Sequence, residues 1–134
     1  MKHQLMVFDW NGTILADTKA SWQASNVMLE FHGAKAISLA QFQKTFHFPV
    51  IHFYRLNGCA VDEVLARQAE SNVLFQAKYE GLSKNARTRR GVRALLQWLK
   101  NKNVHCMILS NYRTDKIGAQ LTRLKLAEFF SFVS

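Results

Sequence analysis

Residues 4–15, Gln-Leu-Met-Val-Phe-Asp-Trp-Asn-Gly-Thr-Ile-Leu, decide the fold of this chain. Leu5 to Phe8 are apolar without alternation, which predicts a strand of a parallel sheet, buried on both faces under helices. The run stops at Asp9, and ligands of such sheets collect at the carboxyl ends of the strands. Gly12 has no Cβ and permits a tight turn that folds backbone N–H groups toward this carboxylate. The stretch therefore predicts an anionic nucleophile beside amide donors.

A second apolar run, residues 104–109, ends in the same way, at Ser110-Asn111. A hydroxyl and the next backbone N–H at a strand end can hold a phosphate oxygen, aided by the positive end of the following helix. The alternative is structural: Ser110, Asn111 or Thr114 would only cap that helix.

Both strand ends resemble motifs of one family. Asp9-Trp10-Asn11-Gly12-Thr13 resembles the first motif of the haloacid dehalogenase-like hydrolases, Asp-x-Asp-Gly-Thr, and Ile108-Leu109-Ser110-Asn111 resembles the second. The resemblance implies a phosphatase of small phosphomonoesters in which Asp9 forms an aspartyl-phosphate. It also implies that Gly12, Thr13, Ser110 and Asn111 bind the phosphate.

The one departure in the first motif is Asn11, which stands where the family has its second Asp. That Asp protonates the leaving oxygen and later activates water, and an amide does neither. General acid–base assistance is typically worth about 10² to 10⁴ in rate. We therefore expect any activity to favour substrates with good leaving groups.

The family's Mg²⁺ site is expected in part. The resemblance implies Mg²⁺ held by an Asp9 oxygen and the Asn11 backbone carbonyl, with further acidic ligands and a Lys in motifs after the third strand. Neither motif occurs before Ser134. We expect either a fragment of a protein of roughly 200 residues, weak or inactive alone, or association through an unpaired sheet edge.

Residues 17–86 have helical patterns throughout, and the resemblance implies an inserted helical cap of the phosphoglycolate-phosphatase-like type. Ser38 to Gln41 reads as a capping box for a short helix that stops before Pro49. Asp62 is the expected start of a longer helix whose inner face follows four-residue spacing: Val61, Leu65, Ala69, Val73 and Ala77. Side chains that could meet a substrate are Phe46, His47 and Arg55, with Trp10 and Trp22 as further candidates, although Trp22 and Phe46 are expected by default to pack in the core.

The chain then returns to the sheet. Gly91 opens an amphipathic helix with Val92, Leu95, Leu96 and Leu99 inward, and a later helix carries Ile117, Leu121 and Leu124. Residues 129–133 are expected to form another strand. The predicted fold is α/β: a Rossmann-like parallel core, incomplete in this chain, over residues 1–16 and 87–134, with the helical cap at 17–86.

Composition limits the class of protein. The chain has 134 residues, 49% of them hydrophobic, and no apolar run approaches the roughly 20 residues needed to span a bilayer. Met1-Lys2-His3 leads directly into the first strand, so we expect a cytoplasmic protein without a signal peptide or membrane association. Cys59 and Cys106 are expected to be reduced and packed.

The net charge of +9 is concentrated in one stretch. Residues 84–125 hold eleven Lys or Arg side chains and a single acid, Asp115. A nucleic-acid surface is one interpretation, but no recognition helix or stacking platform accompanies the charge. We favour a solvated region that attracts small anionic substrates. Two functions other than catalysis stay open: an inactive phosphatase-like module that binds a phosphorylated ligand or protein, and a basic nucleic-acid-binding protein.

Overall fold

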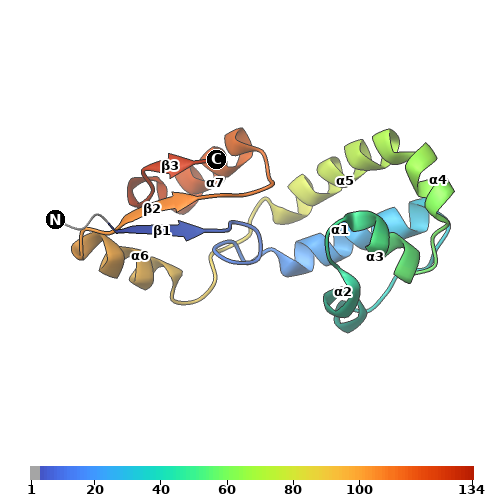
Figure 1. Ribbon diagram of the computed structural model, residues 1–134, viewed down its shortest axis with the longest axis horizontal. Helices are drawn as coiled ribbons and strands as arrows, with labels where there is room; N and C mark the ends of the chain where they lie inside the picture. Colours follow the sequence, from blue (N-terminus) through green and yellow to red (C-terminus); the bar gives the residue numbers. More distant parts are fainter. Residues whose placement is uncertain (1–3) are drawn as a thin grey trace. The chain divides into compact units, whose positions relative to one another are not determined.

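The computed structural model describes residues 4–134 and divides the chain into two compact units (Figure 1). One unit contains the chain up to Asp17 together with Ala86–Ser134, and the other is Thr18–Asn85. Met1-Lys2-His3, on which the expected compartment rests, lies outside the described residues. Within residues 4–134, no helix is long and apolar enough to cross a membrane.

The first unit is an α/β unit, which we call the sheet unit. Its three strands form one parallel sheet in the order β1-β2-β3, in which Phe8 of β1 is opposite Ile108 of β2. The predicted parallel α/β arrangement is confirmed. The elements in chain order are β1 (Leu5–Phe8), α6 (Val92–Asn101), β2 (His105–Ile108), α7 (Thr114–Leu124), the 3-10 helix η1 (Ala127–Phe129) and β3 (Phe132–Val133).

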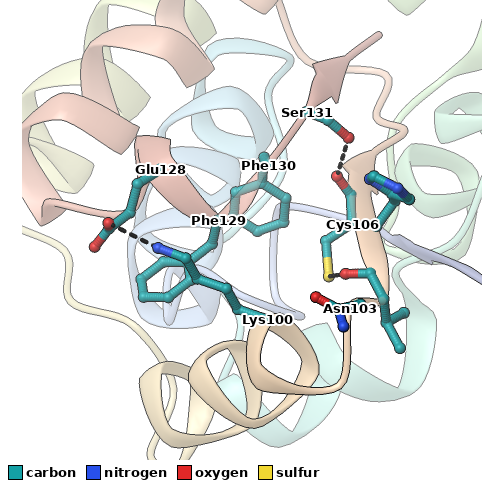
Figure 2. Close-up of a pocket in the computed structure, with 9 residues that line it drawn as sticks. Lys100, Asn103, Cys106, Glu128, Phe129, Phe130 and Ser131 are labelled. Carbon is teal, nitrogen blue, oxygen red and sulfur yellow. Dashed lines mark hydrogen bonds and ion pairs between the residues drawn. The ribbon is translucent and has the colours of Figure 1, made fainter.

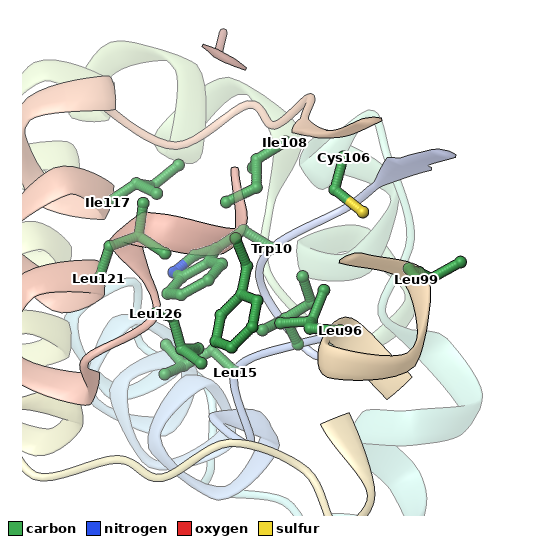
Figure 3. Close-up of a cluster of buried hydrophobic side chains, with 11 residues drawn as sticks. Trp10, Leu15, Leu96, Leu99, Cys106, Ile108, Ile117, Leu121 and Leu126 are labelled. Atoms are coloured by element: carbon green, nitrogen blue, oxygen red, sulfur yellow. The ribbon is translucent and has the colours of Figure 1, made fainter. Parts of the chain in front are cut away.

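The core of the sheet unit lies on one face of the sheet. Cys106 and Ile108 point to the same face because side chains alternate along a strand, and both are buried against residues of α6 and α7. Trp10 lies at the centre of this cluster and is fully buried (Figure 3). Both helices therefore cover a single face, as expected when two right-handed crossovers advance in one direction across the sheet.

The other face of the sheet is uncovered within the described residues. Val7, Met107 and Phe132 form a row across the three strands, and Val7 and Phe132 are 47% and 59% exposed. Leu5 is 60% exposed. The prediction that β1 is buried on both faces is wrong for this chain, because β1 is an edge strand with helices on one side only. The expected association through this edge stays a prediction.

Two further details of the sheet unit differ from expectation. Leu95 was predicted to face inward but is 44% exposed, since Leu96 and Leu99 of α6 fill the contact with the sheet. The predicted strand over residues 129–133 is shorter: the chain first turns through η1, which buries Phe129, and only Phe132–Val133 pairs with β2.

The second unit, which we call the helical unit, contains no strand in the described structure. Its helices are α1 (Thr18–Phe31), α2 (Leu39–Thr45), α3 (Val50–Leu56), α4 (Val61–Ala66) and α5 (Gln68–Ser83). Ser38 caps α2 as predicted, because its hydroxyl accepts the N–H of Gln41 at 3.1 Å. An aromatic cluster that includes Phe42 and Phe53 forms the core.

The prediction of one helix beginning at Asp62 is wrong. The chain breaks at Arg67 into α4 and α5, and α4 is preceded by Ala60. Leu65 and Val73 of the predicted inner face are 54% and 73% exposed. The physical reason is geometric: four residues turn a helix by about 400°, so a strict four-residue spacing drifts by about 40° per step and leaves the buried face.

Both cysteines are free thiols in buried positions, as predicted. Burial raises the pKa of the Cys106 thiol, and burial together with the charge of Glu63 raises the pKa of the Cys59 thiol. Neither thiol is therefore activated as a nucleophile.

Candidate active site at the strand ends

The sheet register brings the two predicted motifs together. Leu109 N–H donates to the Phe8 carbonyl at 2.9 Å, so Asp9 and Ser110 leave neighbouring strands at the same edge of the sheet. Ser110 N–H in turn donates to the Ser134 carbonyl at 2.8 Å. Residues a hundred positions apart in sequence thus share one end of the sheet, where ligands of parallel sheets bind.

Asp9 is exposed, and one of its oxygens is fixed. The backbone N–H of Trp10 donates to Asp9 Oδ1 at 2.7 Å. The bond holds the carboxylate in one orientation and leaves Oδ2 as the oxygen that can meet a ligand. Trp10 itself is fully buried, with its indole N–H bonded to Gln120 Oε1 at 2.6 Å. Its candidacy as a substrate contact was therefore wrong.

The turn after Asp9 closes on itself. Gly12 has φ 74°, a left-handed conformation that favours glycine. Its N–H donates to the Leu15 carbonyl at 3.0 Å, and the N–H of Thr13 donates to the Trp10 carbonyl at 3.3 Å. Of the backbone N–H groups expected to face the carboxylate, that of Trp10 does so, whereas those of Gly12 and Thr13 have partners within the turn. The role of Gly12 and Thr13 in phosphate binding stays a prediction.

Asn11 is held by a residue that the sequence analysis treated only as a boundary. Its side-chain Nδ2 donates to Asp17 Oδ2 at 2.9 Å. Asp17 is only 2% exposed. A signal was present in the sequence, since a charged residue directly before a helix ordinarily has a specific partner or a capping role.

Ser110 makes a local turn and does not cap the next helix. Its Oγ accepts the N–H of Tyr112 at 3.1 Å. Helix α7 begins at Thr114, with Arg113 in the capping position and without a side-chain cap. The capping alternative is therefore wrong for Ser110, Asn111 and Thr114. Asn111 is exposed at the same strand end.

Several arginines of the basic stretch bond to backbone carbonyls of their own unit. Arg89 Nε donates to the Gly12 carbonyl at 2.5 Å, and Arg93 donates to the Leu124 carbonyl at the end of α7 at 2.6 Å. Arg123 donates to the Ala86 carbonyl at 2.7 Å. Part of the positive charge thus holds the chain where it re-enters the sheet unit and closes the first-motif turn.

The single acid of that stretch is also engaged. Arg113 bonds to Asp115 through two nitrogens, at 3.1 and 2.9 Å. Desolvation would raise the pKa of Asp115, but the hydrogen bond and charge of Arg113 hold it below its usual value. The pair is exposed, so its contribution to stability is small.

The donor set for Mg²⁺ is partial. Within residues 4–134, no three His, Cys, Asp or Glu side chains gather closely enough to hold a metal ion. Carboxylate and carbonyl oxygens, the groups that Asp9 and Asn11 offer, are the hard ligands that Mg²⁺ prefers. The ion commonly keeps several waters and takes one or two carboxylates plus substrate phosphate. The two residues fit such a site as part of its ligands.

The candidate substrate-contacting residues of the helical unit lie on the surface of that unit or in its core. His47 is exposed, its Nδ1 donates to the Thr45 carbonyl at 2.8 Å, and its ring stacks on that of His52. Arg55 is exposed. Phe46 packs between Phe42 and Phe53, so it is chiefly a core residue. Trp22 is also half-buried, with its indole bonded to the Ile37 carbonyl.

A cavity of about 290 Å³ opens at the opposite ends of the strands (Figure 2). His105 and Cys106 at the start of β2 and Ser131 before β3 line it, and a Lys100–Glu128 ion pair of 3.2 Å borders it. Strand polarity places this cavity away from Asp9. Because parallel sheets bind ligands at the carboxyl ends, we assign the candidate site to Asp9 and Ser110.

The whole arrangement has counterparts among known proteins. The family model described as haloacid dehalogenase-like hydrolase matches residues 6–134. The chain belongs to the haloacid dehalogenase-like hydrolases. Both predicted motifs fall within the matched range. Asn11 therefore replaces the usual second aspartate of the first motif in a chain that is a member of the family. No curated protein has a significant sequence match to the chain.

Solved structures of this family share the fold. A candidate phosphoglycolate phosphatase from Lactobacillus delbrueckii subsp. bulgaricus is 20% identical with a TM-score of 0.73, covering 99% of this chain and 64% of its own. A haloacid dehalogenase-like hydrolase from Streptococcus pneumoniae is 14% identical with a TM-score of 0.78, and the match covers 98% of this chain and 60% of that protein. A predicted phosphatase from Clostridium acetobutylicum is 17% identical with a TM-score of 0.69, and the match covers 99% of this chain and 61% of that protein.

These likenesses establish the fold. The chain has the α/β, Rossmann-like fold of haloacid dehalogenase-like hydrolases, with three of its parallel strands. It spans less than two thirds of the length of the three structures.

Proposed function

We propose that this chain provides the nucleophile and phosphate-binding side of a phosphatase for small phosphomonoesters. The observation that supports the proposal is the register of β1 and β2, which sets Asp9 and Ser110 at adjoining strand ends. Family membership gives the class of reaction, hydrolysis.

In the proposed reaction, Asp9 Oδ2 attacks phosphorus. A bond forms between the carboxylate oxygen and phosphorus while the ester P–O bond breaks, and the leaving oxygen departs with the bonding electron pair and takes a proton from solvent water. Water then attacks the aspartyl-phosphate, releasing inorganic phosphate and restoring Asp9. Ser110 Oγ and the Asn111 N–H would bind the phosphoryl oxygens.

Mg²⁺, held by Asp9 and the Asn11 carbonyl, would reduce the repulsion between the carboxylate and the phosphate when bound. The helical unit is proposed as the cap that selects substrates, with Arg55 and His47 as its exposed polar candidates. An exposed arginine such as Arg55 is suited to bind a second anionic group of a substrate.

The test is hydrolysis of p-nitrophenyl phosphate by the 134-residue chain with Mg²⁺. We expect weak release from this good leaving group, falling to the background rate in Asp9→Asn, since the nucleophile is removed. Asp62→Asn, an exposed change in the helical unit, is the matched control. Equal rates in native protein and Asp9→Asn would refute the nucleophile assignment.

The same assay tests the departure at position 11. Asn11→Asp restores a proton donor, so we expect hydrolysis of an alkyl phosphate to rise about 10²-fold while p-nitrophenyl phosphate changes less. An equal response of both substrates would contradict this role.

A second candidate function is a binding module without turnover. The amide at Asn11 favours it, because it removes the family's usual proton donor. Binding of inorganic phosphate at the strand ends, together with no release from either ester, would establish this alternative over the enzyme.

A further inference from the structure

Asp17 stands out among the buried residues of the sheet unit. Of the polar or charged side chains that the structure describes in this unit, it is the only buried one. A buried carboxylate is costly unless hydrogen bonds satisfy it. The sheet unit therefore maintains one buried acid, and that acid lies against the first-motif turn.

The partner of Asp17 defines how Asn11 is oriented. The Asn11 Nδ2 nitrogen donates to Asp17 Oδ2 at 2.9 Å, and this nitrogen is the only donor of the amide group. The amide is planar with its oxygen and nitrogen about 120° apart, and Oδ1 is therefore directed away from Asp17. The assignment follows from chemistry rather than from the similar shapes of the two atoms.

The backbone around Asn11 is also fixed. Arg89 Nε bonds to the Gly12 carbonyl, and Gly12 N–H bonds to the Leu15 carbonyl. A Cβ placed on Gly12 would lie 4.0 Å from Asp17 Oδ1, so the carboxylate packs directly under the turn. With backbone and amide both held, the rotation of the Asn11 side chain is restricted.

We propose that Asp17 is a positioning residue that makes Asn11 Oδ1 a hydrogen-bond acceptor toward the ligand of Asp9. The inference rests on the proposed function. It names the ligand group by chemistry: a hydroxyl donor, either the attacking water or an alcohol on the leaving side. Asn11 Oδ1 orients that hydroxyl and no proton is transferred to it.

A purely structural role is the competing explanation. Asp17 directly precedes α1, where aspartate is a common helix cap. A cap would stabilise α1 without affecting Asn11. The two roles differ in what happens to the Asn11 amide when Asp17 is changed.

The first experiment follows the Asn11 side-chain amide by ¹⁵N NMR without ligand. Asp17→Ala should shift its resonances and speed the exchange of its protons, whereas Asp17→Asn should restore most of the native signal because an amide oxygen still accepts. Asn26, which bonds to the backbone of Ile37, is the internal control and should stay unchanged. An Asn11 amide with the same shifts and exchange in all three proteins would overturn the proposal.

The second experiment separates binding from chemistry on p-nitrophenyl phosphate with Mg²⁺. We expect Asp17→Ala to lower kcat about tenfold, the worth of one charged hydrogen bond, with little change in KM, and Asp17→Asn to recover most of it. Asp62→Asn controls for charge. The proposal is also overturned if each Asp17 variant changes kcat and KM by the same factor. If the native protein shows no turnover, the binding module is favoured over the enzyme, while the NMR result still decides whether Asp17 positions the Asn11 amide.

Discussion

The sheet unit and the helical unit bury different kinds of side chain. In the described part of the sheet unit the core is apolar except for Asp17. The helical unit buries several polar groups, His32 among them, beside an aromatic cluster. His32 Nδ1 lies 2.7 Å from Glu63 Oε2, and its Nε2 is buried without a hydrogen-bond partner in the described structure.

This difference between the two units shows which of them can hold reactive side chains in a defined geometry. In the sheet unit, hydrogen-bond register fixes Asp9 beside the second strand end, so residues distant in sequence acquire one geometry. The contact between His32 and Glu63 in the helical unit instead joins the end of one helix to another: His32 directly follows α1 and Glu63 lies in α4. Its polar groups specify the packing of that unit. If the two units are stabilised independently, a substitution in the core of one should leave the stability of the other unchanged.

The largest effect is expected for Trp10→Ala. Removing a fully buried tryptophan should lower the free energy of unfolding of the sheet unit by about 3–5 kcal/mol. Native-state hydrogen exchange should show faster exchange in β2 and α7 with α1 and α5 unaffected. Trp98→Ala is the control, since Trp98 is 56% exposed. Equal loss of protection in both units would show that they unfold together.

The second effect is a pH dependence of the helical unit that depends on Tyr54. Burial, with a smaller contribution from Cys59, raises the pKa of Tyr54 from 10.0 to about 12. Between these values the unfolded chain has lost the proton and the folded chain keeps it, so stability falls as pH rises. The loss should approach about 2–3 kcal/mol.

Denaturant unfolding measured from about pH 9 to about pH 12 tests this dependence. Tyr54→Phe should remove most of the fall in the helical unit, and Tyr112→Phe in the sheet unit should leave it in place. A fall of the same size in Tyr54→Phe would contradict the assignment.

The third effect concerns the buried histidine. Glu63→Ala removes the partner of the buried His32 Nδ1, which should destabilise the helical unit by about 1–3 kcal/mol. Glu63→Gln should lose less because its oxygen still accepts. Glu70→Ala is the control, since Glu70 makes only an exposed pair with Arg67. Thermal unfolding of the four proteins compares them, and equal losses in the two Ala variants would count against a special role for Glu63.

The smallest effect contrasts two glycines. Gly12→Ala should destabilise the sheet unit by about 1–2 kcal/mol because φ is 74° there. Gly81→Ala lies within α5 with nothing near its added Cβ and should stabilise the helical unit by up to about 1 kcal/mol. Opposite changes in unfolding free energy would sharpen the comparison, and a neutral Gly12→Ala would remove the argument for a strained turn.

Sequence patterns predicted most of the fold where local signals were strong. The strand before Asp9, the strand before Ser110 and the Ser38 cap are all present. The patterns failed for the helix broken at Arg67, where a four-residue spacing drifts around the helix axis. They also failed for the burial of β1, which depends on the strands and helices that lie beside it. Periodicity reports the shape of one element and cannot show whether a second layer covers it.

For the candidate site, the residue types were predictable but their partners were not. Asp9 and Ser110 stand out in the sequence because each follows an apolar run, and Asn11 stands out because it replaces the second Asp of the family's first motif. The contact of Asn11 with Asp17 and that of Arg89 with the Gly12 carbonyl were missed. Such contacts depend on how the chain turns after β1, and no repeat or spacing encodes that turn.

The sequence by itself determined that a carboxylate ends the first strand, that a serine ends the second, and that the family's second aspartate is replaced by Asn11. Apolar runs and their stops are local, so their consequences follow from the order of residues alone. Only the tertiary structure decided that Asp9 and Ser110 lie at the same end of the sheet, that one sheet face is uncovered within residues 4–134, and that Asn11 donates a hydrogen bond to Asp17. These facts depend on register and on packing between distant segments, which residue order constrains only through the whole fold.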